Sequence, residues 1–165
     1  MKVIVKKYGG TSVSSVLKIK SIAKEVVEDA AYCKVVVVLS AMGKTTDQLV
    51  ALANRCSKNP DMRDYDLLVS SGEQISISLL SMSIKDLGRD SVAYTGWQAG
   101  IRTNNSHSSA RIVNINANKI KKDLKENKIV IIAGFQGINN GFITTLGRGG
   151  SDTSAVAIAA ALKAS

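Results

Sequence analysis

A glycine-rich stretch near the end of the chain has the residue types that hold an anion. Residues 147–152 read Gly-Arg-Gly-Gly-Ser-Asp. Glycines let the backbone approach an anion closely, and their N–H groups can form a cradle with the start of the next helix. Arg148 can bind a carboxylate or a phosphate through two hydrogen bonds. A plain loop in which Asp152 caps the helix is an equally good interpretation of this stretch alone.

A second candidate follows the first apolar segment of the chain, where Lys7 and Tyr8 precede two glycines, Gly9 and Gly10. A lysine at this position could neutralise a phosphate oxygen as charge develops during phosphoryl transfer. The alternative is a tight turn with a surface lysine. No GxxxxGK[ST] pattern occurs in the sequence, so this is not a Walker A loop.

Hydroxyl groups and a carboxylate make up the third candidate. Residues 40–47 follow an apolar run and contain Ser40, Thr45 and Thr46, whose hydroxyl groups could bind a small polar substrate. Alternatively, Thr45 or Thr46 simply caps the next helix. Glu73 lies in the first turn of an expected helix. Stabilisation of the helix dipole explains a carboxylate there, and so does an ion pair with the ammonium group of a substrate.

Composition limits the class of protein. A chain of 165 residues, 45% hydrophobic and 21% charged, fits one globular domain. The net charge of +9 suits a polyanionic ligand such as a nucleotide or a nucleic-acid backbone, and surface composition alone also explains it. Only 4% of residues are aromatic, which argues against binding of single-stranded nucleic acid. The longest apolar run, 35–39, is far too short for a membrane span.

Cysteine and histidine usage favours a cytosolic protein without a structural metal. Cys33 and Cys56 form no CxxC pair, and we expect both to be free thiols. His107 is the only histidine, so no zinc site is expected. The N-terminus also lacks the apolar segment of a signal peptide.

Apolar periodicity predicts alternating strands and helices, and therefore an α/β domain with a mostly parallel sheet. In such sheets, ligands bind beyond the carboxyl ends of the strands, and the loops 7–12, 40–47 and 147–152 could all open on that edge. Residues 59–66 and 96–109 are expected to be connections, and the last helix to be buried. The expected strands are 3–5, 35–39, 91–95, 112–115 and 129–133, with a hairpin at 135–145, and the expected helices are 16–30, 47–55, 71–87, 117–126 and 152–163.

Taken together, these segments resemble the aspartokinases of the amino-acid kinase family. The longest of them covers residues 144–155, Thr-Thr-Leu-Gly-Arg-Gly-Gly-Ser-Asp-Thr-Ser-Ala. Kinases of this family that act on other substrates share the early lysine-glycine strand end but not the whole set. The other matching segments are 7–13, 38–43 with 45–47, 71–76, 96–100 and 134–137, in the order of the family and across nearly the whole chain.

The resemblance implies a three-layer α/β/α sandwich and a reaction in which ATP, with Mg²⁺, phosphorylates the side chain of L-aspartate. It further implies a cytoplasmic enzyme of lysine, threonine and methionine biosynthesis that is a homo-oligomer at full length, without nucleic-acid or membrane partners. Family members are much longer, so residues 1–165 correspond to the N-terminal portion of the kinase domain. The remainder of the nucleotide site and the regulatory ACT domains lie outside it, and we expect this chain alone to be weakly active or inactive.

The resemblance also assigns roles to residues. Lys7 would contact the transferring phosphoryl group, and Asp152 would orient that lysine or the substrate. Arg148 would bind a carboxylate of aspartate, and Glu73 its ammonium group. No protein metal ligands are implied. Ser40, Thr46 and Ser151 would supply hydroxyl groups to the substrate, Phe135 would form a wall of its pocket, and Tyr8, Gly9, Gly10, Gly149 and Gly150 would lie on the nucleotide side.

Two other hypotheses remain open at this stage. A sibling kinase could act on a different acidic substrate. Alternatively, a module of the same fold could bind ligands without catalysis, in which case loss of Lys7, Arg148 or Asp152 would be expected. All three residues are present.

Overall fold

Four parallel strands form the central sheet in the computed structural model, which describes residues 2–165. The strands are β1 (Val3–Tyr8), β2 (Lys34–Leu39), β3 (Ser91–Tyr94) and β6 (Ile129–Ala133), and their spatial order is β1-β2-β6-β3. Runs of β-branched residues favour such strands, because a parallel sheet is covered on both faces. The predicted parallel α/β class is confirmed.

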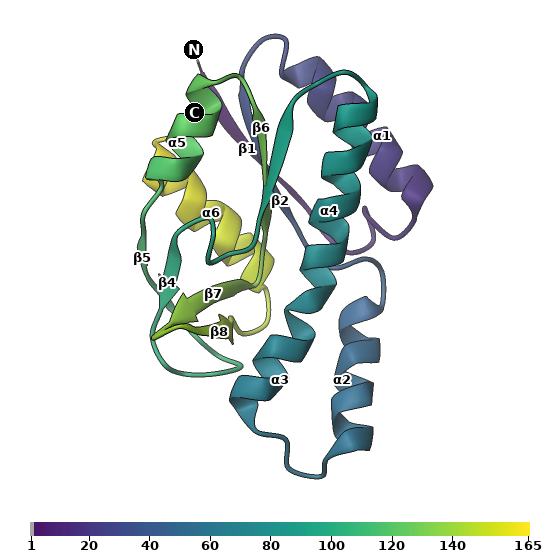
Figure 1. Cartoon of the computed structure of the whole chain (residues 1–165), viewed down its shortest axis with the longest axis vertical. Coiled ribbons are helices and arrows are strands. Elements are labelled where there is room, and N and C mark those ends of the chain that lie inside the picture. Colours follow the sequence, from purple (N-terminus) through teal and green to yellow (C-terminus); the bar gives the residue numbers. More distant parts are fainter. Residues whose placement is uncertain (1) are drawn as a thin grey trace.

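Helices cover both faces of this sheet (Figure 1). The side chains of Val35 and Val37 in β2 pack into one apolar cluster with α1 (Val16–Asp29) and α4 (Ser71–Asp86). The alternate residues of β2, Val36 and Val38, point to the opposite face and pack with other helices. The result is the expected three-layer α/β/α sandwich. The helices on this second face are α5 (Asn118–Lys125) and α6 (Gly150–Leu162).

A smaller mixed sheet lies beside the central one, with the order β5-β4-β7-β8. The predicted hairpin is confirmed, and its turn has positive φ at Asn140 and Gly141, as a tight β-turn of this kind requires. Residues 96–109 were predicted to be a loop, but they contain a short strand in which Ile101 and Thr103 are buried. A strand of three residues is too short to show a periodic pattern in the sequence. The strands are β4 (Ile101–Thr103), β5 (Ile112–Ile115), β7 (Gln136–Asn139) and β8 (Phe142–Thr145).

The connection predicted at residues 59–66 was wrong in its second half. Helix α2 (Thr45–Cys56) is followed by α3 (Met62–Val69), whose first N–H groups are capped by the side chain of Asp61. The many charged residues suggested a loop. Arg63 and Asp64 do face solvent, but Asp66 and Val69 are buried on the other side of the helix. Helices α3 and α4 together, residues Met62–Asp86, are long and apolar enough to cross a membrane. However, 56% of the most apolar 18 residues of this stretch is buried inside the fold, as in the core helix of a globular protein.

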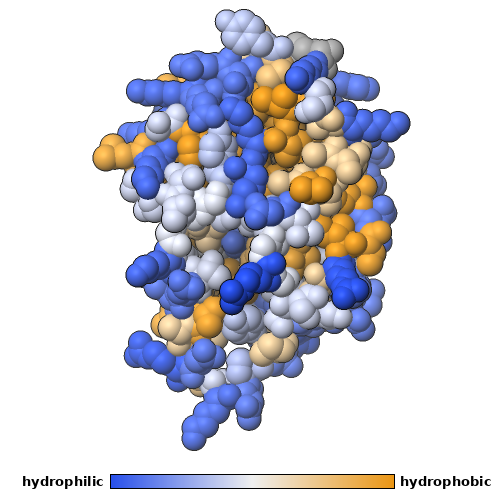
Figure 2. Space-filling model, turned by 180° about the vertical axis from the view of Figure 1, so that it is seen from behind, coloured by the Kyte–Doolittle hydropathy of each residue, from blue (hydrophilic) through white to orange (hydrophobic). Residues whose placement is uncertain are grey.

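The last helix is buried on one face only, and not throughout as its alanine and valine content predicted. Ala155 and Ile158 of α6 pack against the central sheet, whereas Val156 is 71% exposed. Seen from behind, the molecule has hydrophobic surface gathered in its upper and right-hand parts (Figure 2). Cys33 and Cys56 are both free, as expected.

Candidate active site

Three loops meet in one pocket at the carboxyl ends of β1 and β2, as the sequence predicted. The pocket has a volume of about 270 Å³. Loop 9–15 leads from β1 into α1, loop 40–44 leads from β2 into α2, and loop 146–149 leads from β8 into α6. The pocket lining comprises Lys7, Gly10, Ser40, Ala41, Gly43, Thr46, Glu73, Phe135 and residues 147–152.

An ion pair in this pocket joins Lys7, near the start of the sequence, to Asp152, near its end. Nζ of Lys7 lies 2.9 Å from Oδ1 of Asp152, which is in the first turn of α6. Lys7 is mostly enclosed, with 28% of its side chain exposed, whereas the Asp152 side chain is 68% exposed. The lysine ammonium is therefore held at the mouth of the pocket by a carboxylate that solvent can reach.

The first two loops pack backbone to backbone at Gly10. A Cβ atom there would lie 3.0 Å from the carbonyl oxygen of Ala41 and 3.2 Å from that of Gly43. The N–H of Gly43 donates a hydrogen bond to the carbonyl of Gly10. Glycine is required because a side chain would push the two loops apart. The loops can thus form a narrow rim beside the lysine.

Glu73 is a buried carboxylate with one oxygen left without a partner. The residue is 3% exposed, and its Oε1 accepts the N–H of Ala41 at 3.2 Å. Oε2 makes no hydrogen bond within the described residues. Burial raises the pKa of Glu73 to about 7, only partly offset by backbone hydrogen bonds. A cationic group entering the pocket would restore its charge and satisfy Oε2.

Tight packing fixes the start of α6 against Phe135. A Cβ atom on Gly150 would lie 2.8 Å from Cδ2 of Phe135, so only glycine fits. The N–H of Phe135 donates to Oγ of Ser154, which itself donates to the carbonyl of Gly150. The first N–H groups of a helix have no partner inside the helix. They lie next to the pocket here, where an anion can use them.

Almost all residues predicted to form the site are brought together, with Tyr8 as the exception. Tyr8 follows Lys7 on β1, so its side chain points to the opposite face of the sheet. There its hydroxyl donates to Oε1 of Glu25 at 2.9 Å, and burial raises the pKa of Tyr8. Gly9 is adjacent to the pocket, since a Cβ atom on it would lie 3.3 Å from Nζ of Lys7.

One polar cluster next to the site was missed by the sequence reasoning. Asp66 of α3 is fully buried and accepts hydrogen bonds from the N–H of Ser108 and the N–H of Thr145, each at 3.0 Å. Its Oδ2 also lies 2.8 Å from Nδ1 of His107. Asp66 thereby fixes the end of β8, immediately before the loop that carries Arg148. The only available signal was a lone histidine in a region expected to be a loop.

This arrangement places a lysine, an arginine and a buried carboxylate around one pocket at the ends of two parallel strands. The sequence model of the amino acid kinase family matches residues 2–165, and the chain belongs to that family.

Within the family, the chain is similar to aspartokinases. It is 57% identical to the aspartokinase of Bacillus sp. strain MGA3 and 55% identical to aspartokinase 2 of Bacillus subtilis strain 168, with 99% of this chain matched in both cases. The chain spans about 40% of the length of these curated relatives.

Among solved structures, too, the chain is similar to aspartate kinases. Aspartate kinase from Synechocystis is 46% identical, with a TM-score of 0.84 over 99% of this chain and 27% of that chain. Aspartokinase III of E. coli, in complex with aspartate and ADP, is 28% identical, with a TM-score of 0.88 over 100% of this chain and 48% of that chain.

Proposed function

We propose that this protein is an aspartate kinase, which transfers the γ-phosphoryl group of ATP to the side-chain carboxylate of L-aspartate and forms 4-phospho-L-aspartate. The observation that carries the proposal is the unpaired, buried oxygen of Glu73 in a pocket that also contains Lys7 and Arg148. The names of the relatives and the aspartate and ADP in the E. coli structure support it.

The charges of the pocket match those of the substrate. Aspartate has one ammonium group and two carboxylates. Glu73 would accept the ammonium group, and Arg148 would bind a carboxylate with its two parallel N–H donors. Ser40, Thr46 and Ser151 line the same pocket and would donate hydroxyl hydrogen bonds, while the ring of Phe135 would close one side. Such a set holds the nucleophile in place, which is a major part of catalysis in group transfer.

Phosphoryl transfer also needs positive charge near the transferring group. Lys7 would supply this charge, and Asp152 would keep the lysine in place through the observed ion pair. The N–H groups of Gly9, Gly10, Gly149 and Gly150 would face the phosphates. Residues 2–165 contain no group of three or more acidic, histidine or cysteine side chains that could hold a metal ion. We propose that Mg²⁺ enters with ATP, held mainly by phosphate oxygens and water.

The chemistry requires no general base, because the side-chain carboxylate of aspartate is already ionised at neutral pH. The site therefore needs no histidine, and His107 lies outside it. The nucleophilic oxygen attacks the γ-phosphorus, the bond from that phosphorus to the bridging oxygen breaks, and ADP leaves.

We further propose that the enzyme acts in the cytoplasm, in lysine, threonine and methionine biosynthesis, as a homo-oligomer without nucleic-acid or membrane partners. Because this chain corresponds to about 40% of its relatives, we propose that residues outside it complete the ATP site. On this proposal the 165-residue chain binds aspartate weakly and turns over poorly or not at all.

Calorimetric titration of this chain with L-aspartate, L-glutamate and Mg-ATP tests the proposal. We expect weak but saturable heat for aspartate, much less for glutamate, and no measurable binding of Mg-ATP. A preference for glutamate would indicate the sibling-kinase alternative. Binding of aspartate combined with no phosphoryl transfer by the whole protein would indicate a non-catalytic module.

A further inference from the structure

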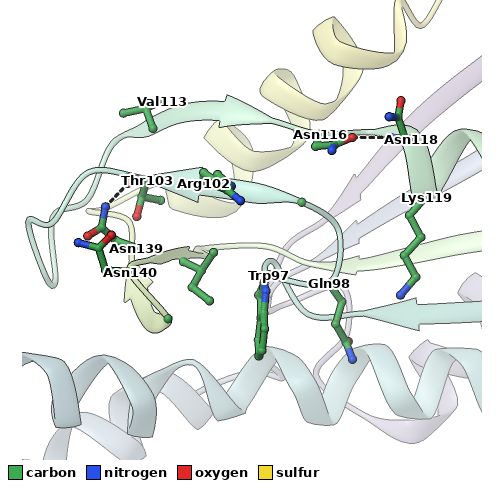
Figure 3. Close-up of a pocket in the computed structure, with 13 residues that line it drawn as sticks. Trp97, Gln98, Arg102, Thr103, Val113, Asn116, Asn118, Lys119, Asn139 and Asn140 are labelled. Carbon is green, nitrogen blue, oxygen red and sulfur yellow. Dashed lines mark hydrogen bonds between the residues drawn. The ribbon is translucent and has the colours of Figure 1, made fainter.

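A second, larger pocket lies between the small sheet and the start of α5, with a volume of about 730 Å³ (Figure 3). Arg102 of β4 and Ile138 of β7 contribute to one side. Trp97 and Gln98, from the loop before β4, and Lys119 of α5 complete it. Within residues 2–165, none of its lining residues belongs to the pocket around Lys7. The size is typical of sites for small organic ligands.

The charged lining of this pocket is entirely positive. Arg102 and Lys119 line it, and no aspartate or glutamate does so in the part of the chain that the structure describes. Neither cation forms a salt bridge with another of the described residues. Lys119 instead holds its ammonium group 4.3 Å from the centre of the Tyr94 ring, which limits where the charge can lie. The charge that the lining presents to a ligand is therefore positive only.

The amide side chains add hydrogen-bond donors to this positive lining. Oε1 of Gln98 accepts the N–H of Thr95 at 3.0 Å, and Oδ1 of Asn116 accepts the N–H of Asn118 at 3.2 Å. The acceptor atoms of both amides are thus occupied by the backbone, and their NH₂ groups remain for a ligand. A ligand rich in acceptor atoms matches these groups.

An exposed indole ring gives the pocket a flat apolar surface. Trp97 is 60% exposed and is the only tryptophan in the sequence. Figure 3 shows its side chain, with those of Gln98 and Lys119, around the same space that Arg102 borders. An indole in this setting can stack on the face of a planar ring, as aromatic side chains do with nucleobases.

We propose that this pocket binds a small organic anion with a planar ring, whose ring stacks on Trp97 and whose acidic group is held by Arg102 and Lys119. The acidic group can be a phosphate, as in a nucleoside monophosphate, or a carboxylate, as in an aromatic acid. The proposal is independent of the aspartate kinase assignment, because it concerns different residues and a different ligand.

Fluorescence of the single tryptophan measures occupancy at this pocket directly. The chain is titrated with adenosine monophosphate and with nicotinate, which distinguish a phosphate from a carboxylate, and with inorganic phosphate and adenosine, which carry only one half of the ligand each. We expect a saturable change in emission with one of the two ring-bearing anions. Inorganic phosphate and adenosine should bind at least about tenfold more weakly, since each loses one set of contacts.

Variants separate this site from general attraction to a basic protein. Arg102→Met and Lys119→Met should each weaken binding at least about tenfold. The matched controls Arg55→Met and Lys122→Met change exposed cations on α2 and α5 that do not line this pocket, and should leave affinity unchanged. Trp97→Leu, measured by calorimetry, should also weaken binding. Titration with L-aspartate should leave the emission unaltered.

Three results would overturn the proposal. The first is the absence of a saturable change with either ring-bearing anion. The second is an equal loss of affinity in the control variants, which would mean that overall charge is responsible. The third is an affinity for inorganic phosphate equal to that of the best ring-bearing anion, which would remove the role of Trp97. Circular dichroism of each variant verifies that it is folded, and these exposed positions should not disturb folding.

Discussion

Nζ of Lys7 lies 2.9 Å from Oδ1 of Asp152, so that an ion pair joins β1 to the first turn of α6. A partly exposed pair of this kind adds little to stability. The ion pair instead positions the ammonium group of Lys7, which it holds where the proposed phosphoryl group would be transferred. The neighbouring Lys6 pairs with Glu25 and Asp29 on the other face of the sheet.

Replacement of Lys7 by methionine should lower kcat of the whole protein roughly 100- to 1000-fold, as expected for loss of one group that stabilises transition-state charge. The KM for aspartate should change little, because the lysine faces the phosphoryl group. ADP release with Mg-ATP and aspartate measures both constants. Lys6→Met is the matched control and should retain kcat, since Lys6 points away from the pocket. An undiminished kcat in Lys7→Met would remove Lys7 from the mechanism.

Glu73 should make stability depend on pH. Burial raises the pKa of Glu73 to about 7, so its carboxyl group is protonated in the folded state between about pH 5 and pH 7. In the unfolded state the same group is ionised over this range. Its contribution to the free energy of unfolding therefore falls as pH rises through 7, by at most about 3 kcal/mol. Glu73→Gln stays neutral and should lack this loss. Its free energy of unfolding, relative to that of the wild type, should therefore be higher at pH 8 than at pH 5.

Urea denaturation at the two pH values measures this difference, with the exposed Glu28→Gln as the control. An identical pH dependence in Glu73→Gln and the wild type would contradict the buried-carboxylate interpretation. The same protonation should weaken aspartate binding below about pH 7, since a neutral Glu73 cannot pair with an ammonium group.

Arg148→Lys should raise the KM for aspartate roughly 10- to 100-fold, because a lysine keeps the charge but cannot form two parallel hydrogen bonds with a carboxylate. The KM for ATP should be much less affected. Steady-state kinetics in both substrates gives the comparison, and Arg55→Lys on α2 is the control. If the KM for ATP rose instead, Arg148 would belong on the nucleotide side.

Asp66→Ala should lower the free energy of unfolding by about 3 kcal/mol, because it leaves the buried N–H of Thr145 and the partly buried N–H of Ser108 without an acceptor. Asp64→Ala, on the same helix but exposed, should cost far less. Thermal denaturation compares the two. Equal effects would show that the Asp66 cluster is not a structural centre.

The central sheet was predictable because runs such as Val35 to Leu39 are apolar throughout and mostly β-branched, a pattern typical of strands buried on both faces. The start of α3 was not, since its charged residues resemble a loop until the buried positions of Asp66 and Val69 are known. Strand β4 was too short to show periodicity, and one of its two pairing partners, β7, is distant in sequence.

The site residues were predictable to the extent that they follow strands. Lys7 and Ser40 end parallel neighbouring strands, so their convergence follows from topology. Tyr8 was misplaced because its glycine-rich context outweighed the alternation of side chains along β1. The Asp66 cluster joins α3 to a loop and to β8, and such contacts depend on tertiary packing rather than on any local pattern.

The most direct measurement is detection of the product. The whole protein, supplied with Mg-ATP and L-aspartate and quenched with hydroxylamine, should yield aspartyl hydroxamate in amounts equal to the ADP released. An acyl phosphate on the side chain reacts in this way. L-glutamate in place of L-aspartate should give neither product. ADP release that does not depend on aspartate, or an absence of hydroxamate, would contradict the assignment of this protein as an aspartate kinase.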